Sequence, residues 1–257
     1  MKEILRLDNV THRYHGRSGE TLAIEGLSLA VGEGEFYGIV GPSGSGKTTL
    51  LSILAGILRP SEGALVRGIS PSEIGYMLQH DHLFEWRTIE DNVTLGLEIR
   101  GSRTKENVAY ARSLLDKYNL GDFLKKRPSE LSGGMRQRVA LIRTLALRPK
   151  LILLDEPFSA LDFQTRLTVA DDVRDIILRE GITAILVTHD ISEAIALSDR
   201  IAVLSARPAR VKKVFDVPID KSLSSIERRE ATAFTSLFRD VWKELEFTYE
   251  KDKEGVQ

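Results

Sequence analysis

Cysteine is absent from the 257 residues of the chain. This absence excludes disulfide bonds, thiolate metal ligands and cysteine catalysis, and it is typical of proteins in a reducing compartment. The sequence also lacks any apolar run close to the roughly 20 residues that a membrane-spanning helix needs. Residues 1–8 are charged and alternating, so we expect no secretory signal peptide there. We therefore expect any membrane role to depend on a partner.

An excess of charge of one sign is missing as well. The chain has 36 basic and 37 acidic residues and a net charge of −1. A dedicated nucleic-acid-binding protein is usually basic, so we expect no nucleic acid among the partners. Hydrophobic residues make up 42% of the chain and charged residues 28%, an ordinary globular balance. The length allows one large or two small domains with a buried core.

Residues 41–48 read GPSGSGKT, a complete G-x-x-x-x-G-K-[ST] phosphate loop. The apolar run at 36–40 predicts a strand before the loop, and the spacing of apolar residues from 47 to 57 predicts a helix after it. A glycine-rich turn without a ligand is the alternative interpretation, and this strand–loop–helix context disfavours it. The loop residues expected to bind a nucleotide are Gly41, Pro42, Ser43, Gly44, Ser45, Gly46, Lys47, Thr48 and Thr49.

The chemistry of such a loop follows from its residue types. Its glycines allow backbone N–H groups to surround phosphates, and the following helix adds its positive N-terminal end. We expect Lys47 to reach the β- and γ-phosphates of ATP and the Thr48 hydroxyl to bind Mg²⁺.

Asp155 and Glu156 end the apolar run LILL at residues 151–154. A carboxylate at the end of a buried parallel strand lies where open α/β sheets bind ligands. A neighbouring carboxylate at the same strand tip can accept a proton from an attacking water. A solvated acidic strand end is the alternative, and the phosphate loop elsewhere in the chain disfavours it.

Continuous apolar runs at residues 151–154, 184–187 and 201–204 predict buried strands of a parallel sheet. Helical segments at 164–180 and 191–197 separate them, and this alternation is typical of an α/β fold.

Other regions differ from this α/β pattern. Residues 4–10 and 27–31 alternate and predict strands. Residues 86–148 are rich in charged helical segments, so we expect a helical subdomain inserted into the α/β core. After Pro218 the chain becomes more polar, and residues 225–246 predict an amphipathic helix. That segment could pack on the core, contact a second copy or serve as a regulatory appendage. We assign it no ligand.

Residues 131–135 read LSGGM and open a basic amphipathic helix between the phosphate loop and the acidic strand. Ser132 is a good N-cap, and Gly133 and Gly134 allow an anion to approach the backbone. Together with GPSGSGKT, this segment resembles the signature of the ATP-binding cassette (ABC) ATPases. Met135 stands where Gln is commonest in that family. The resemblance covers nearly all of residues 1–215.

The resemblance to ABC ATPases implies a P-loop NTPase (RecA-like) core with an N-terminal antiparallel β subdomain and an inserted α-helical subdomain. We place the ATPase domain at residues 1–217, its helical subdomain at about 86–148 and a C-terminal helical extension at 218–257. The resemblance also implies a dimer of two copies. In it, Ser132, Gly133 and Gly134 of one copy close over the ATP held by the other.

The same resemblance implies roles for single residues. Asp155 would act on Mg²⁺ directly or through its water, and Glu156 would polarise the attacking water. Gln79, after a predicted strand at 74–78, would sense Mg²⁺ and the γ-phosphate, and His189 would contact the γ-phosphate. The expected metal residues are thus Thr48, Gln79 and Asp155, and the expected catalytic residues are Lys47, Gln79, Glu156 and His189.

Two further residues gain a role in this way. Tyr14 corresponds to the aromatic residue that stacks on adenine in the family. An isolated tyrosine after a strand is more often a packing residue, which is the alternative. Asp162, in the segment Ser159-Ala160-Leu161-Asp162, corresponds to the D-loop that lies across the dimer seam.

Trp86-Arg87-Thr88 and Arg207-Pro208 resemble elements of the nitrate-, sulfonate- and taurine-type importers, although Glu85 stands where that group commonly has Pro. The resemblance implies the nucleotide-binding subunit of an importer of a small anion, small organic solute or vitamin precursor. Its partners would be a transmembrane permease, contacted through residues 79–88, and indirectly a solute-binding protein. Its place would be peripheral, at the cytoplasmic face of the inner membrane.

Two other functions remain open from the sequence. One is the ATPase of an exporter encoded apart from its permease. The other is a cassette ATPase acting on ribosomes or DNA, whose relatives generally carry two cassettes or a long coiled-coil insertion. This sequence shows neither feature.

Overall fold

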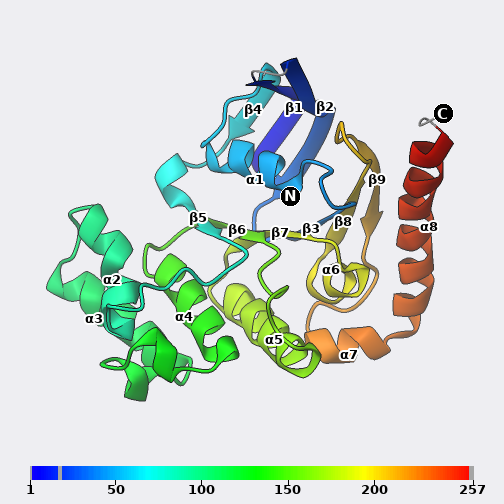
Figure 1. Ribbon diagram of the computed structural model, residues 1–257. Coiled ribbons are helices and arrows are strands. Elements are labelled where there is room, and N and C mark those ends of the chain that lie inside the picture. The colour runs from blue at the N-terminus through cyan, green and yellow to red at the C-terminus, as the bar shows by residue number, and fades with distance from the viewer. Residues whose placement is uncertain (1, 17–18, 255–257) are drawn as a thin grey trace.

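A computed structural model describes residues 2–16 and 19–254, with side chains described as far as residue 245. A three-stranded antiparallel sheet has the order β2-β1-β4 and lies at the top of Figure 1. Its strands are β1 (Glu3–Gly16), β2 (Gly19–Gly32) and β4 (Glu62–Arg67). The two predicted strand segments belong to β1 and β2, which form one long hairpin. Strand β4 was not predicted, because its apolar segment, Ala64 to Val66, is only three residues long and follows the turn after α1 directly.

A second sheet crosses the centre of the molecule with the order β5-β6-β7-β3-β8-β9. Strands β5 to β8 and β3 are parallel, whereas β9 pairs antiparallel with β8. Every residue of β3, β6 and β7 is buried, which explains why these strands read as continuous apolar runs. The bounds are β3 Phe36–Val40, β5 Ile74–Met77, β6 Leu151–Asp155, β7 Thr183–Thr188, β8 Arg200–Leu204 and β9 Val211–Asp216.

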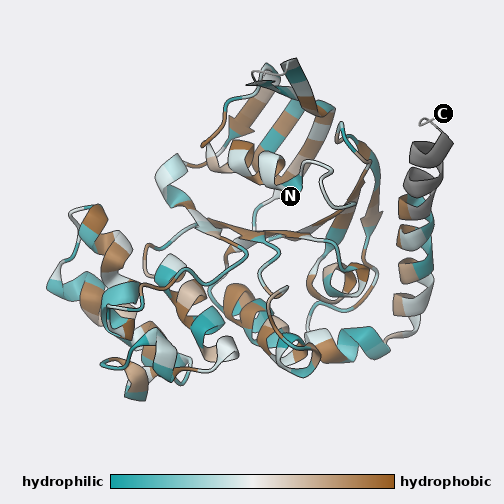
Figure 2. Cartoon of the chain, viewed as in Figure 1, coloured by the Kyte–Doolittle hydropathy of each residue, from teal (hydrophilic) through white to brown (hydrophobic). Residues whose placement is uncertain are grey.

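Helix α1 (Lys47–Ala55) lies between the two sheets, and its apolar side chains join a core with residues from both. The other face of the central sheet packs on α4 (Gly133–Leu145) and α5 (Phe163–Arg179). Figure 2 shows hydrophobic colour concentrated along the sheet and on the helix faces turned toward it. The predicted α/β layering is therefore present.

The predicted helical subdomain extends to one side of the sheet. It consists of α2 (Ile89–Ile99), α3 (Lys105–Lys117) and α4, joined by short 3₁₀ turns at Gly121–Phe123 and Pro128–Glu130. A third 3₁₀ turn, Pro71–Glu73, precedes β5. Thr88 and Thr104 cap α2 and α3 by accepting hydrogen bonds from backbone N–H groups of their first turns.

The C-terminal extension departs from its prediction. A single helix over 225–246 is wrong, because the structure has α7 (Ser225–Glu230) and α8 (Thr232–Glu254). Ala231 between them is extended, with φ −63° and ψ 140°. Helix α8 packs beside α6 (Ile191–Leu197), β8 and β9, and buries Leu237 and Val241. Residues 255–257 of the expected extension lie outside the described residues.

Candidate nucleotide site

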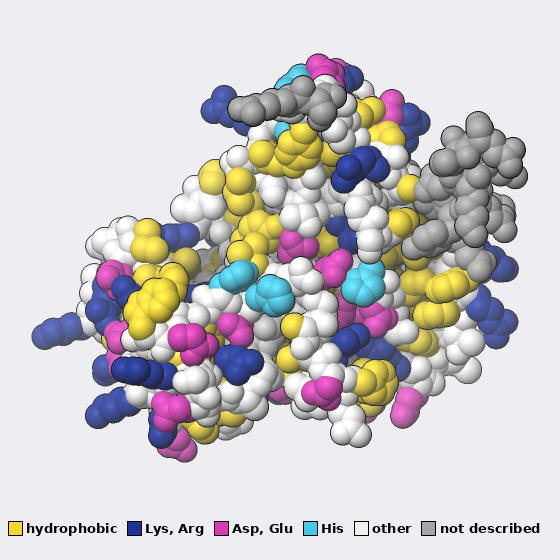
Figure 3. Space-filling view, viewed as in Figure 1, with side chains coloured by type: hydrophobic (Ala, Val, Ile, Leu, Met, Phe, Trp, Pro, Cys, Tyr) yellow, Lys and Arg dark blue, Asp and Glu magenta, His cyan; other side chains and the backbone are white. Residues whose placement is uncertain are grey.

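Four loops meet at the carboxyl edge of the central sheet. The register pairs Val40 with Thr188 and Asp155 with Val187, so β3, β6 and β7 end side by side. Strand β5 joins them, because Met77 pairs with Leu154. The segments that follow these strands contain the phosphate loop, Glu156, His189 and Gln79. In Figure 3, histidine and acidic side chains gather across the middle of the molecule, over this sheet.

The phosphate loop wraps the N-terminus of α1. Gly46 has φ 112°, and a side-chain carbon there would lie 2.8 Å from the carbonyl oxygen of Ala23. Only glycine therefore fits this position without displacing β2. A cavity of about 320 Å³ lies in front of the loop, lined by Ser43, Gly44, Gly46, Lys47, Thr48, Thr49, Glu156 and Arg207.

Lys47 is 5% exposed and points back along the loop. Its ammonium group donates hydrogen bonds to the carbonyl oxygens of Gly41 (2.9 Å) and Pro42 (2.8 Å). Burial lowers the pKa of Lys47, while Glu156 and Asp155 oppose this shift. The Lys47 Nζ atom is 4.0 Å from a Glu156 carboxylate oxygen. This cation is thus held inside the cavity, where a phosphate would compete with the backbone carbonyls for it.

Asp155, at the end of β6, is buried and lies between two hydroxyl groups. Tyr76 donates to its carboxylate at 3.2 Å, and the Thr48 hydroxyl also hydrogen-bonds to it. Burial raises the pKa of Asp155, and these hydrogen bonds act in the opposite direction. One carboxylate beside one hydroxyl suits Mg²⁺, which keeps several waters and takes its other oxygens from substrate phosphates. Among the described residues, no group of three or more His, Cys, Asp and Glu forms a metal cage.

Glu156 follows Asp155 with φ 46°, a left-handed conformation that is uncommon for a residue with a side chain. Its N–H donates to the carbonyl of Val187, which fixes this turn against β7. One carboxylate oxygen is 3.0 Å from Nδ1 of His189. The other lies on the side of Lys47. The structure therefore brings Glu156, the predicted base, into direct contact with His189, which is expected to contact the γ-phosphate.

Gln79 is connected to Glu156 by hydrogen bonds through Ser159. Its amide donates to the Ser159 hydroxyl at 3.2 Å, and that hydroxyl donates to the Glu156 carbonyl at 3.0 Å. Gln79 is thus near Glu156, although its side chain is not among those that line the cavity in front of the phosphate loop.

Tyr14, on β1, lies beside the phosphate loop. Its hydroxyl is 3.1 Å from the Thr49 hydroxyl, and its ring meets the His12 ring edge-on at 4.7 Å. The side chain is 42% exposed. The side chain is therefore partly accessible beside the first turn of α1, and adenine stacking on it stays a prediction.

The signature residues lie away from this cavity. Ser132 is exposed and caps α4 by accepting a hydrogen bond from the Met135 N–H at 3.3 Å. Gly134 is buried, and a side-chain carbon there would lie 2.8 Å from Val169 of α5. This glycine therefore permits close packing of α4 on α5. Neither residue lines the phosphate-loop cavity of its own chain.

Asp162 also serves its own helix. Its carboxylate accepts a hydrogen bond from the Thr165 N–H at 3.1 Å and caps α5. Hydrogen bonds from Thr165 lower the pKa of Asp162.

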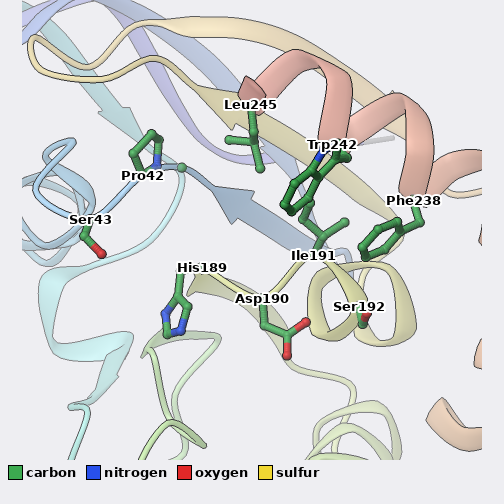
Figure 4. A pocket seen from close by; sticks show the side chains of 10 residues that line it. Pro42, Ser43, His189, Asp190, Ile191, Ser192, Phe238, Trp242 and Leu245 are labelled. Carbon is green, nitrogen blue, oxygen red and sulfur yellow. The ribbon is translucent and has the colours of Figure 1, made fainter. Parts of the chain in front are cut away.

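Two features near His189 were not predicted from the sequence. Glu193, only 4% exposed, shares a small pocket with Glu156 and His189, and burial raises its pKa to about 7. A larger cavity of about 430 Å³ lies between the loop segments at Pro42 and His189 and the side of α8 that carries Trp242. Figure 4 shows the aromatic rings of α8 facing the turn after β7. No sequence motif marks either feature, because both arise from packing of α6 and α8.

Comparison with known proteins assigns the chain to a family. Residues 24–159 match the protein family described as ABC transporter. An uncharacterized ABC transporter ATP-binding protein of Bacillus subtilis, YtlC, is 48% identical over 94% of this chain and 95% of its own. The nitrate transport protein NasD of Klebsiella oxytoca is 37% identical over 100% of both chains. The taurine import ATP-binding protein TauB of Ruegeria pomeroyi is 39% identical over 90% of each.

Comparison with solved structures supports the same family. The dimeric ATP-binding cassette MJ0796, in a post-hydrolysis state bound to ADP and Pi, matches with a TM-score of 0.67 and 30% identity. The match covers 83% of this chain and 98% of that one. The chain belongs to the ABC transporter family and is an ATP-binding subunit with ATPase activity. The fold class and the family expected from GPSGSGKT and LSGGM are confirmed. No helix in the described part of the chain is long and apolar enough to cross a membrane.

Proposed function

We propose that this chain is the ATP-hydrolysing subunit of an importer for a small anion or small organic solute, a range that includes vitamin precursors. The carrying observation is its full-length similarity to proteins named for nitrate transport and taurine import. Trp86-Arg87-Thr88 and Arg207-Pro208 support the same group. We place the subunit at the cytoplasmic face of the inner membrane, bound to a permease. A solute-binding protein would deliver the solute to that permease.

The proposed reaction is in-line attack of water on the γ-phosphate of ATP. Glu156 would accept a proton from that water, because its carboxylate lies within the loop cavity and is oriented by His189 at 3.0 Å. Lys47 would leave the carbonyl oxygens of Gly41 and Pro42 to bind the β- and γ-phosphates. When bound, Mg²⁺ would neutralise phosphate charge. Asp155 and Thr48 would hold it, and we expect Gln79 to reach it from the segment after β5.

A second copy completes the proposed site. Ser132, Gly133 and Gly134 lie outside the phosphate cavity of their own chain, so they can contact nucleotide only in another copy. The exposed Ser132 stands at the N-terminus of α4, where backbone N–H groups favour an anion. Because contacts to the γ-phosphate would form only in the closed dimer, ATP would favour closure and ADP would not.

The segment 79–88 has the contacts needed to carry this motion to a permease. Arg143 of α4 donates to the carbonyl oxygens of Asp81 and His82, both at 2.7 Å, and Arg136 pairs with the Asp81 carboxylate at 3.1 Å. Because these contacts fasten the segment to the signature helix, we expect the two to move together. Trp86, at 71% exposure, lies against Phe84 with the two rings tilted by 36° and their centroids 4.7 Å apart, and it would present an apolar surface to a partner.

Affinity purification from native membranes in mild detergent, followed by mass spectrometry, tests the transporter role. A multi-span permease together with a solute-binding protein is the expected result. A permease alone would favour an exporter. Ribosomal or DNA-associated proteins in stoichiometric amount would overturn the transport function.

Trp86→Ala tests the permease surface. We expect this variant to lose the copurifying permease, while the isolated subunit hydrolyses ATP at the unchanged rate. Trp242→Ala, which removes an exposed tryptophan on α8, is the matched control and should retain the permease. Equal permease recovery with both variants would contradict the assignment of the surface.

A further inference from the structure

The turn between β8 and β9 lies against the phosphate loop. Within it, Ala209 is fully buried, and its N–H donates to the carbonyl of Ala23 at 2.9 Å. The Ala209 carbonyl accepts a hydrogen bond from the Glu25 N–H at 3.0 Å. A side-chain carbon on Gly46 would lie 3.3 Å from the Ala209 Cβ atom. Strand β2, this turn and the phosphate loop are therefore packed together.

Internal hydrogen bonds fix the shape of the turn. The Ser205 hydroxyl accepts from the Arg210 N–H and donates to the Pro208 carbonyl, both at 2.9 Å. The Ser205 N–H donates to the Arg210 carbonyl, also at 2.9 Å. The backbone at residue 207 consequently has a defined position next to the loop.

Arg207 lines the phosphate-loop cavity opposite the first turn of α1. Its side chain is exposed and has no hydrogen-bond or ion-pair partner among the side chains that the structure describes, residues 2–16 and 19–245. Arg210, on the same turn, differs, because it pairs with Glu25 at 2.6 Å. The other cation lining the cavity is Lys47, which comes from the opposite element. The cavity is thus bordered by two cations, and Glu156 is the one carboxylate in its lining.

We propose that Arg207 binds the phosphates of the nucleotide held by the phosphate loop of the same chain. This inference rests on the proposed nucleotide site. A guanidinium group is always charged and matches phosphate oxygens with two parallel hydrogen bonds. An arginine without a protein partner can make these bonds at little cost, since no ion pair must break. The contact forms on binding, so it strengthens nucleotide affinity and not the chemical step.

The experiment measures the dissociation constants of ATP and ADP in the presence of EDTA, which prevents hydrolysis, by displacement of a fluorescent ATP analogue. Arg207→Ala should weaken both nucleotides about ten-fold, and Arg207→Lys should weaken them less. The difference from the unsubstituted protein should shrink at high salt. In ATPase assays with Mg²⁺, KM should rise by a similar factor while kcat changes less than about two-fold.

Arg210→Ala is the matched control, because it removes an equal charge from the same turn and breaks only an exposed ion pair. Its affinities should stay within about two-fold of those of the unsubstituted protein. Equal affinities of the Arg207→Ala and Arg210→Ala variants would overturn the role of Arg207 and leave the nucleotide site intact. Failure of the unsubstituted protein to bind ATP would overturn the site itself, and the inference with it.

Discussion

At the phosphate loop, Lys47 is buried and already held by two carbonyl oxygens, whereas at the signature turn Ser132 is exposed and caps only its own helix. The first region is a preformed cavity with charged walls. The second is a helix end without a cavity of its own. Under the proposed function, the phosphate loop forms one half of each nucleotide site, and the signature turn of a second copy forms the other half. This difference would allow one chain to bind ATP while hydrolysis requires a second copy.

Glu156→Gln should abolish ATP hydrolysis at the phosphate-loop cavity without changing the shape of that cavity. The amide cannot accept the proton of water, so we expect hydrolysis to fall by at least about 100-fold. ATP binding should persist and a closed dimer should accumulate. Phosphate release and gel filtration with ATP measure these effects, and a variant that hydrolyses ATP at the normal rate would show that Glu156 is misassigned.

Mixing two inactive variants tests the division of the site between copies. Lys47→Ala removes the phosphate half, and Ser132→Arg blocks the signature half, so each alone should be inactive. A mixed dimer contains one intact pairing of loop and signature. Because about half of the dimers are mixed and each has one active site of two, we expect up to about a quarter of normal activity. If the mixture stays as inactive as its components, the two halves do not meet across a dimer.

A buried arginine, Arg228, attaches the C-terminal extension to the core, and its contribution to stability can be measured. Arg228 of α7 is fully buried and donates hydrogen bonds to the carbonyl oxygens of Ile195, Ser198, Ile219 and Asp220. Arg228→Ala would leave these acceptors buried without a donor, so we expect the free energy of unfolding to fall by about 3 kcal/mol. Arg239→Ala, at an exposed position on α8, is the control and should change it by less than about 0.5 kcal/mol. Denaturant titration measures both, and equal stabilities would mean that Arg228 does not fasten the extension.

The pH dependence of stability tests the packing behind His189. Burial raises the pKa of Glu193 to about 7, above its ordinary value of 4.5, despite the nearby Arg166 and Arg229. The folded chain therefore binds the proton more tightly, and stability should fall as pH rises from about 4.5 to 7.

Glu193→Gln removes this titration. We expect the variant to be more stable than the unsubstituted protein at pH 8, by up to about 3 kcal/mol, and similar to it near pH 5. Glu230→Gln, at an exposed glutamate, should show no such divergence. Thermal unfolding at several pH values measures the difference, and parallel pH profiles for the Glu193→Gln variant and the unsubstituted protein would contradict it.

Local sequence patterns were enough to predict the phosphate loop, the acidic strand end, the buried strands and the family. Each of these features can be recognised from neighbouring residues alone. GPSGSGKT is a continuous motif, and LILL followed by Asp155 and Glu156 indicates the end of a buried strand. The same local signals predicted helices between about residues 86 and 148, where the structure has α2, α3 and α4.

Which of these groups lie in contact follows from the packing of segments that are distant in the chain. Strand order brings His189 within 3.0 Å of Glu156, although 33 residues separate them in the chain. It also places the β8–β9 turn with Arg207 beside the phosphate loop, and it breaks the predicted C-terminal helix at Ala231 so that α8 can pack on α6. These features arise from burial and strand pairing between distant segments, and such contacts leave no periodic pattern in the sequence.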